Sequence, residues 1–143
     1  MIDPHLLADI KAAEGCSFTC YNDSLGFPTI GYGHYLSVEQ PGIVWSQEQC
    51  DAELEMDIEL AQGYAQALPE WKYLDTPCRQ NAVTELYFNM GSKWLSFLET
   101  RTAIKLQHWQ AAHDGLLNSL WATQVGPTRS QRLAGYFLTG RYV

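Results

Sequence analysis

The apolar positions of the first segment recur at the spacing of a helix face, and they are Leu6, Leu7, Ile10 and Ala13. Asp3 can cap such a helix, Pro4 suits its first turn, and Gly15 can end it. We therefore predict a helix that ends at Glu14.

The next pattern is typical of short strands. Residues 17–21 and 27–32 hold aromatic and β-branched side chains on either side of the turn Asn22-Asp23-Ser24-Leu25-Gly26. This arrangement predicts a hairpin or a small three-stranded sheet. Residues 35–45 contain Pro41 and Gly42 and are expected to form a longer loop or an irregular last strand.

A long helical pattern follows the loop. Ser46 and Gln49 form a capping-box pattern. Apolar residues then recur at Cys50, Leu54, Ile58, Ala61 and Ala65. We predict one long helix to about Leu68, before Pro69.

The remainder reads as helices. Thr76 and Pro77 match a cap and a first helical residue, so we predict a core helix to Met90 that Gly91 terminates. Shorter helices are expected over residues 95–107, 109–121 and 128–138, with residues 124–127 as the last loop.

Composition sets limits on this picture. The chain has 143 residues, of which 46% are hydrophobic, enough for one sizeable core that two lobes could share. It has neither an apolar run of about 20 residues nor a signal-peptide pattern at its start, so we expect a soluble protein made in the cytosol. The four cysteines include no Cys-x-x-Cys pair, which argues against a zinc site and favours free thiols. Cys16 and Cys20 have no assigned role.

The charges are unevenly distributed. Residues 1–91 hold 14 acidic and 3 basic residues, whereas residues 92–143 hold 2 acidic and 6 basic ones. Overall acidity argues against a general nucleic-acid binder. The basic C-terminal part could attract an anionic polymer, but an acidic solvated helix opposite a few arginines explains the same pattern.

Glu14 and Asp23 are two carboxylates in different surroundings. Glu14 stands at a helix C-terminus, where the helix dipole disfavours an anion by about 0.3–1 kcal/mol and should raise its pKa. Asp23 lies in a polar turn, where water and backbone amides should keep it ionised. A pair with different proton occupancy is the pattern that acid/base catalysis needs.

The motif around these residues resembles the phage-type lysozymes, the T-even-like muramidases that serve as endolysins. It consists of Glu14-Gly15, Tyr21, Asp23 and the run from Thr29 to His34, TIGYGH. The separations from Glu14 to Asp23 and from Asp23 to Thr29 also match that family. The likeness continues in residues 88–91, 109–112, 119–132 and 138–141, and so covers nearly the whole chain in order.

The resemblance implies an α+β fold of the lysozyme type, with a small β-containing N-terminal lobe and a larger helical lobe. A long helix would join the lobes across a substrate cleft. We expect one phage-type lysozyme domain over residues 1–143. Residues 14–68 would form the small lobe and connecting helix, and residues 1–13 and 69–143 the helical lobe.

The resemblance also implies hydrolysis of the β-1,4 bond between N-acetylmuramic acid and N-acetylglucosamine in peptidoglycan, without metal or cofactor. By position, Glu14 would be the general acid, Asp23 the carboxylate that activates or orients water, and Thr29 the hydroxyl that holds that water. The expected substrate-binding residues are Tyr32, Phe88, Asn89, Gly91, Gln124 and Arg129. His34 receives no catalytic role and could instead pair with a carboxylate such as Asp75.

The expected biological role is host lysis. The enzyme would be a monomer made in the host cytoplasm, would not insert into membranes or bind nucleic acid, and would reach the cell wall through a membrane hole made by a holin. Two alternatives remain, a lytic transglycosylase and an inert cell-wall-binding or virion-associated relative. Asp23 and Thr29 disfavour the first because that reaction holds no water, and the intact catalytic set disfavours the second.

Overall fold

The computed structural model of the protein describes residues 1–142 and divides the chain into two compact units, Met1–Leu60 and Ala61–Val143. The fold is α+β, as predicted, with a small antiparallel sheet among many helices. None of the helices within residues 1–142 combines the length and hydropathy that crossing a membrane requires.

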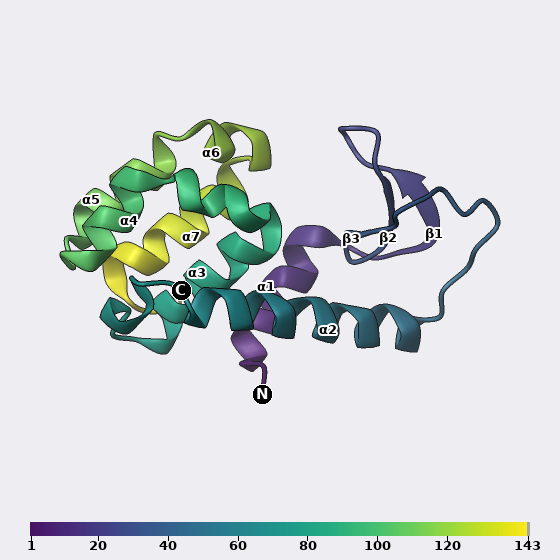
Figure 1. The fold of residues 1–143 in the computed structure, drawn as a ribbon, viewed down its shortest axis with the longest axis horizontal. Helices are drawn as coiled ribbons and strands as arrows, with labels where there is room; N and C mark the ends of the chain where they lie inside the picture. Colours follow the sequence, from purple (N-terminus) through teal and green to yellow (C-terminus); the bar gives the residue numbers. More distant parts are fainter. Residues whose placement is uncertain (143) are drawn as a thin grey trace. The chain divides into compact units, whose positions relative to one another are not determined.

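The first unit begins with α1, Pro4–Glu14, followed by strands β1, Ser17–Asn22, β2, Pro28–Gly31, and β3, His34–Tyr35. The Asp3 side chain accepts a hydrogen bond from the backbone of His5 at the start of α1, a cap worth about 1 kcal/mol. The strands pair in the order β1-β2-β3, visible at the right of Figure 1. The predicted first helix and small sheet are thus confirmed.

The segment after the sheet is mostly loop, as expected. Val44 forms one isolated bridge with Thr19 of β1. Helix α2, Gln47–Gln66, then begins with the predicted capping box, in which the Ser46 backbone donates to Gln49 at 2.8 Å and the Gln49 backbone donates to the Ser46 hydroxyl at 3.1 Å. Figure 1 shows α2 as one continuous helix.

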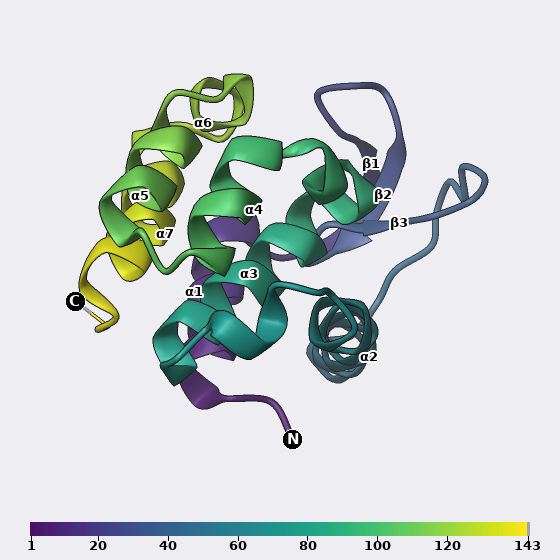
Figure 2. The same cartoon turned by 60° about the vertical axis from the view of Figure 1, so that its left-hand side comes forward.

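The second unit consists of helices around an apolar core. After the short 3₁₀ helix η1, Trp71–Tyr73, come α3, Pro77–Met90, the 3₁₀ helix η2, Gly91–Ser96, and α4, Leu98–Lys105. The last elements are α5, Trp109–Leu117, α6, Leu120–Val125, and α7, Pro127–Thr139. Helix α5 packs against both α4 and α7, as Figure 2 shows, and α3 is buried along residues 81–86.

Three predicted boundaries in this unit were wrong. The helix expected over residues 95–107 begins at Leu98, because η2 and the non-helical Phe97 precede it. The helix expected over residues 109–121 is two helices, since the Ser119 hydroxyl bonds the Leu116 carbonyl and caps Ala122, which ends α5 and starts α6. The loop expected over residues 124–127 shrinks to Gly126 alone.

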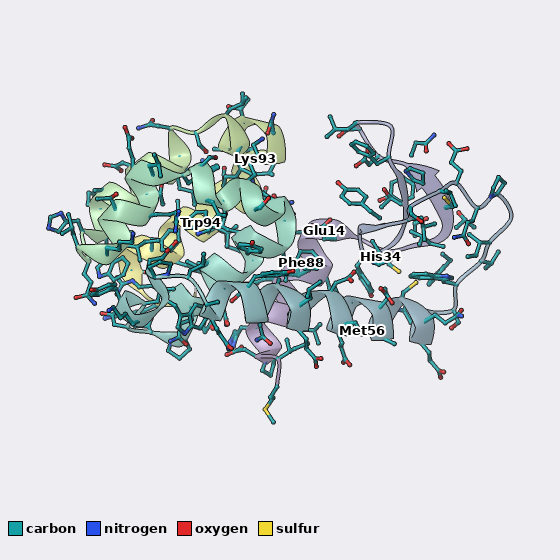
Figure 3. The ribbon with its side chains drawn as sticks, viewed as in Figure 1. Glu14, His34, Met56, Phe88, Lys93 and Trp94 are labelled. Atoms are coloured by element: carbon teal, nitrogen blue, oxygen red, sulfur yellow. The ribbon has the colours of Figure 1, made fainter. Side chains whose placement is uncertain are left out.

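A buried ion pair lies within the second unit. Glu70 is fully buried, and its carboxylate accepts hydrogen bonds from Arg101 Nε at 2.6 Å, Arg101 Nη2 at 3.0 Å and the indole of Trp94 at 3.0 Å. Trp94, labelled in Figure 3, is also fully buried. Because a buried charge is costly without partners, these three bonds are what allow Glu70 to sit in the core.

Candidate active site

Glu14 is the last residue of α1 (Figure 3). The helix ends there because Gly15 adopts a φ of 64° and its backbone donates to the Lys11 carbonyl at 3.0 Å. Gly33 lies against the Glu14 side chain. A Cβ built on Gly33 would come within 2.6 Å of Glu14 Oε2, so a larger residue here would require the Glu14 carboxylate to shift.

Asp23 is held by the backbone of its own turn. Its Oδ1 accepts from the backbone N–H groups of Leu25 and Phe27, both at 2.9 Å, and its carbonyl accepts from Gly26 at 2.9 Å. The Phe27 N–H, followed by contributions from Tyr35, Leu25 and Gly26, lowers the pKa of Asp23 against the opposing effect of desolvation. The predicted ionised carboxylate in a polar turn is the arrangement found.

Thr29 stands in the middle strand and is buried. Its hydroxyl donates to the carbonyl of Phe27 at 2.9 Å. A hydroxyl has one hydrogen and two lone pairs, so this bond uses the donor and leaves the oxygen as an acceptor. Thr29 can therefore receive a hydrogen from a water but does not compete for the water's lone pairs.

Two tyrosines that sequence reasoning did not assign to the site flank Thr29 across the sheet. Tyr21 of β1 and Tyr35 of β3 are its direct partners in the register, so the three side chains share one face. Both phenols are partly exposed, at 41% and 59%. Only the strand pairing places these tyrosines beside Thr29, and a single sequence does not specify this pairing when the turn lengths are unknown.

The electrostatics tie these tyrosines to both carboxylates. Desolvation raises the pKa of Tyr21, and the charges of Glu14 and Asp23 add to it. The pKa of Tyr35 is raised by desolvation, by its hydrogen bond to Asp23, and by the charges of Asp23 and Glu14. Both phenols thus stay protonated at neutral pH, and Tyr35 serves Asp23 as a donor. The structure therefore brings Glu14, Asp23 and Thr29 around a common pair of tyrosines.

Tyr32, a predicted substrate-binding residue, is half-buried beside α1 and α2. Its hydroxyl accepts from Gln47 Nε2 at 3.1 Å, and the Lys11 ammonium lies 5.6 Å from its ring centroid. Gln47 also donates to Asp51 at 2.8 Å, and this bond, with Lys11 nearby, lowers the pKa of Asp51. These contacts fix the ring, and a role in binding substrate stays a prediction.

The other predicted substrate-binding residues lie in the second unit. Phe88, Asn89 and Gly91 occupy the C-terminal end of α3, where Gly91 caps the helix with a φ of 60°. Asn89 Oδ1 accepts from the indole of Trp121 at 2.7 Å, which leaves its amide NH₂ to serve as a donor elsewhere. Gln124 is an exposed residue of α6.

Arg129 is buried in α7, with 8% of its surface exposed. Its Nε donates to Glu85 Oε2 at 2.9 Å, and Arg132 donates to both oxygens of the same carboxylate at 2.9 and 2.8 Å. Glu85 is itself buried. The positive charge of Arg129 is thus partly balanced within the protein.

His34 pairs with different carboxylates from the one suggested. Its Nδ1 lies 2.8 Å from Asp57 Oδ2 and 3.2 Å from Glu53 Oε1, both on α2. Asp75 instead pairs with Arg79 at 2.8 Å, one helical turn away. The pairing with Asp75 was wrong because β3 brings His34 to the turns of α2 that carry Glu53 and Asp57, whereas Asp75 pairs with Arg79, four residues further along the chain.

The cysteines are free thiols, as expected. The thiols of Cys16 and of Cys50 in α2 form a hydrogen bond, and burial together with this contact raises the pKa of Cys50 to about 11. A thiol with that pKa stays protonated at neutral pH and is a poor nucleophile. Cys16 therefore has a partner that its spacing from Cys20 did not indicate, and Cys50 is not suited to catalysis.

Comparison with known proteins places this geometry in context. The family model described as phage lysozyme matches residues 11–135. An endolysin of Salmonella phage P22 is 29% identical over 119 residues, which cover 78% of this chain and 77% of that protein. A probable T4-type lysozyme of Dictyostelium discoideum is 28% identical over 159 aligned positions, which cover 92% of each chain.

The family match begins before Glu14 and ends within α7, so it includes every residue of the candidate site. Since it spans far more than half of the chain, the protein belongs to the phage lysozyme family, and it is accordingly a glycoside hydrolase that acts on peptidoglycan.

Proposed function

We propose that the protein hydrolyses the β-1,4 bond between N-acetylmuramic acid and N-acetylglucosamine, with inversion at the anomeric carbon. Glu14 acts as the general acid on the leaving oxygen, Asp23 as the base, and Thr29 as the acceptor that orients the attacking water. In an inverting hydrolysis the two carboxylates stand on opposite faces of the sugar ring, with room for a water beside the base.

The observation that carries this proposal is the pairing of hydrogen-bond roles at Asp23 and Thr29. Asp23 is ionised and accepts hydrogens, and Thr29 has already donated its own hydrogen to Phe27. A water that donates one hydrogen bond to the Asp23 carboxylate and one to the Thr29 hydroxyl directs a lone pair away from both. Asp23 can then remove a proton from this water as its oxygen bonds to the anomeric carbon. Such an arrangement has no use in a transglycosylase, where the sugar's own hydroxyl attacks.

The structural observations support some of the proposed substrate-binding residues more strongly than others. Gln124 is exposed and can offer both a donor and an acceptor to a sugar amide. The free amide hydrogens of Asn89 suit an acetyl carbonyl, and Tyr32, Phe88 and Gly91 would add contacts to the sugar rings. We propose Arg129 only as a support for this region, because it is buried and its Nε already donates to Glu85.

One digestion experiment tests the reaction. Purified peptidoglycan is treated with wild type, Glu14→Gln and Asp23→Asn, and the product ends are identified by mass spectrometry. Reducing muramic acid ends are expected from wild type, with both variants slower by about 10²–10⁴-fold. Products with 1,6-anhydro ends would instead establish transglycosylation, and intact glycan with the wild type would leave only binding.

Inversion is tested separately. NMR spectra recorded during cleavage of a short glycan should show the α-anomer of the new reducing end first, because inversion at a β-linked carbon gives the α product. Initial release of the β-anomer would mean retention, and would replace the role of Asp23 as a base with that of a nucleophile.

We further propose that the protein is a monomeric endolysin made in the host cytoplasm, which reaches the cell wall once a holin opens the membrane. Cells that express it should keep growing until the membrane is permeabilised, and should then lyse rapidly. Cells that express Glu14→Gln should not lyse under the same treatment. Lysis without permeabilisation would contradict the holin route.

A further inference from the structure

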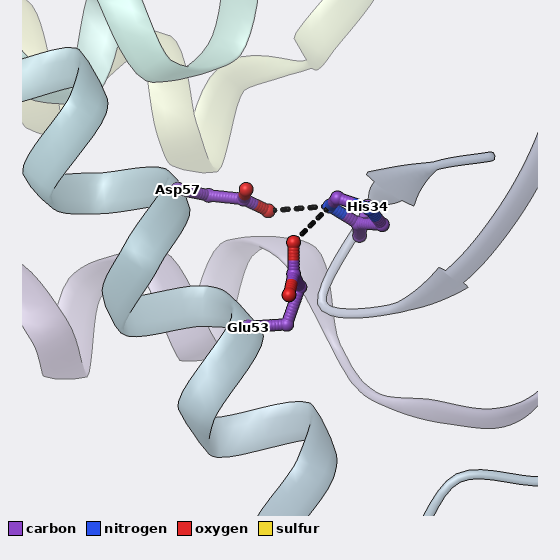
Figure 4. A group of neighbouring side chains, drawn as sticks. All are labelled: His34, Glu53 and Asp57. Atoms are coloured by element: carbon purple, nitrogen blue, oxygen red, sulfur yellow. Dashed lines mark hydrogen bonds and ion pairs between the residues drawn. The ribbon is translucent and has the colours of Figure 1, made fainter. Parts of the chain in front are cut away.

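Three side chains outside the proposed catalytic set converge within the first unit. His34 comes from β3, and Glu53 and Asp57 come from neighbouring turns of α2 (Figure 4). One possible ligand atom from each residue lies within 4.8 Å of the other two. All three residues are partly buried, with 26% of the His34 side chain and 27% of each carboxylate side chain exposed.

A hydrogen bond accounts for only part of this cluster. Nδ1 of an imidazole carries at most one hydrogen, and that hydrogen can be directed well at one acceptor. Asp57, at 2.8 Å, is the better placed acceptor, yet Glu53 also comes within 3.2 Å of the same atom. Two carboxylates four residues apart on a helix repel each other, so their convergence favours a positive charge between them.

We propose that His34, Glu53 and Asp57 bind a divalent first-row transition metal, with zinc as the reference ion and water in the remaining position. Zinc accepts nitrogen and carboxylate ligands at about 2.0–2.2 Å, which places ligand atoms of a tetrahedral site about 3.3 Å from one another. The distance from Nδ1 to Glu53 already has this value, at 3.2 Å. Asp57, at 2.8 Å, needs only a small withdrawal to admit the ion.

The chemistry of binding is an exchange of a proton for the metal. The ion takes the Nδ1 lone pair, and any proton on that nitrogen passes to the solvent. Two carboxylates and one neutral imidazole leave a net charge of −2 to balance a divalent ion. A single turn of helix supplies two of the ligands, the same i,i+4 geometry by which helices present paired metal ligands in other proteins.

The metal would join the last strand of the sheet to α2. It would stabilise the folded form because the unfolded chain has no such site: His34 lies 23 residues from Asp57. From the sequence, we considered only closely spaced cysteines as metal ligands, and we missed this site because its ligands lie far apart in the chain. The inference does not depend on the proposed reaction, and the metal takes no part in it.

Calorimetric titration of the chelator-treated full-length protein with zinc chloride tests the site. One ion should bind per chain, and Glu53→Gln should weaken binding by at least about tenfold. This variant keeps the 2.8 Å contact between His34 and Asp57, so its fold should persist. Glu55→Gln, an exposed neighbour on the same helix, is the matched control and should bind as wild type does.

A second measurement locates the ion. The Trp45 ring lies 5.8 Å from the His34 ring, so Cu²⁺ at the site should quench the fluorescence of Trp45. The quenching should disappear in His34→Gln and in Trp45→Phe. Calcium, which prefers six to eight oxygen ligands, should neither bind nor compete.

Three outcomes would overturn the proposal. The first is no zinc binding by wild type, and the second is binding that Glu53→Gln leaves unchanged, which would place the ion elsewhere, for example on the free thiols. The third is equal binding of calcium, which would reveal a general attraction of cations to acidic side chains.

Discussion

The two units treat a carboxylate in opposite ways. Asp23, in the first unit, stands in a surface turn, and backbone N–H groups of that turn are the main reason for its low pKa. Glu70, in the second unit, is fully buried, which by itself raises its pKa, but the bonds from Arg101, its own backbone and Trp94 outweigh burial and leave the pKa below its usual value.

The difference shows what each carboxylate is suited for. Backbone donors hold Asp23 ionised without a neutralising cation, so its negative charge remains available for a water or a proton. Arg101 occupies both oxygens of Glu70, so that charge is fully used inside the protein. We therefore expect Asp23 to matter for the reaction and Glu70 for folding.

The largest expected effect is on the rate of Asp23→Asn. The asparagine oxygen can still accept from Leu25 and Phe27, so the turn should persist, but an amide cannot accept a proton from water. Peptidoglycan hydrolysis should fall by about 10²–10⁴-fold with little change in the melting temperature. A large loss of stability would mean that Asp23 resembles Glu70 more than we propose. Glu55→Gln serves as the control for loss of one surface charge.

The converse variant is Glu70→Gln, which leaves Arg101 beside a neutral group in the core. Removal of one partner from a buried pair costs about 3–5 kcal/mol of unfolding free energy. Urea titration should show this loss, whereas the rate per folded molecule should stay close to that of wild type. The exposed Glu99→Gln on α4 is the control and should cost no more than about 1 kcal/mol, the usual contribution of an anion in the first turn of a helix.

The same pair predicts a dependence of stability on pH. Since the pKa of Glu70 is lower in the folded protein, the unfolded chain takes up a proton first as the pH falls. The stabilisation is therefore complete above the unfolded pKa and disappears as the pH drops through the folded one. Across that acidic range, the unfolding free energy of Glu70→Gln should vary less with pH than that of wild type.

Gly33→Ala should have an intermediate effect on both properties. A side chain at a φ of 73° costs about 1–2 kcal/mol, and the new Cβ would come within 2.6 Å of Glu14 Oε2 and displace it. A displaced acid should lower the hydrolysis rate by up to about a hundredfold. Gly42→Ala is the matched control, because Gly42 has a φ of 80° but no heavy atom within 4 Å of its Cβ position. Equal loss of rate in the two variants would rule out the contact with Glu14 as the cause.

The smallest predicted effect is a pH shift in Tyr35→Phe. The Tyr35 hydroxyl lowers the pKa of Asp23, so its removal should raise that pKa. The base is then protonated at a higher pH, and the acidic limb of the kcat/KM profile should move upward. Tyr21→Phe is the control, because Asp23 affects the pKa of Tyr21 through its charge, whereas it also forms a hydrogen bond with Tyr35. If the acidic limb of Tyr35→Phe does not shift, the backbone N–H groups of the turn alone keep Asp23 ionised.

Local signals were enough to predict much of the fold. Asp3, Ser46 and Thr76 cap helices as expected, because a capping hydrogen bond forms between residues at most three apart. The boundary errors arose where local competition is close. The apolar pattern runs through Ser119, but its side-chain bonds break the helix there.

By itself, then, the sequence determined most of the elements, the family likeness and the ionised Asp23, since each depends on neighbouring residues or on a motif read in order. Only the tertiary structure decided that Tyr21 and Tyr35 flank Thr29, that His34 meets Glu53 and Asp57, and that Arg129 is paired with Glu85. The physical reason is that these contacts join distant parts of the chain, so they depend on strand register and helix packing.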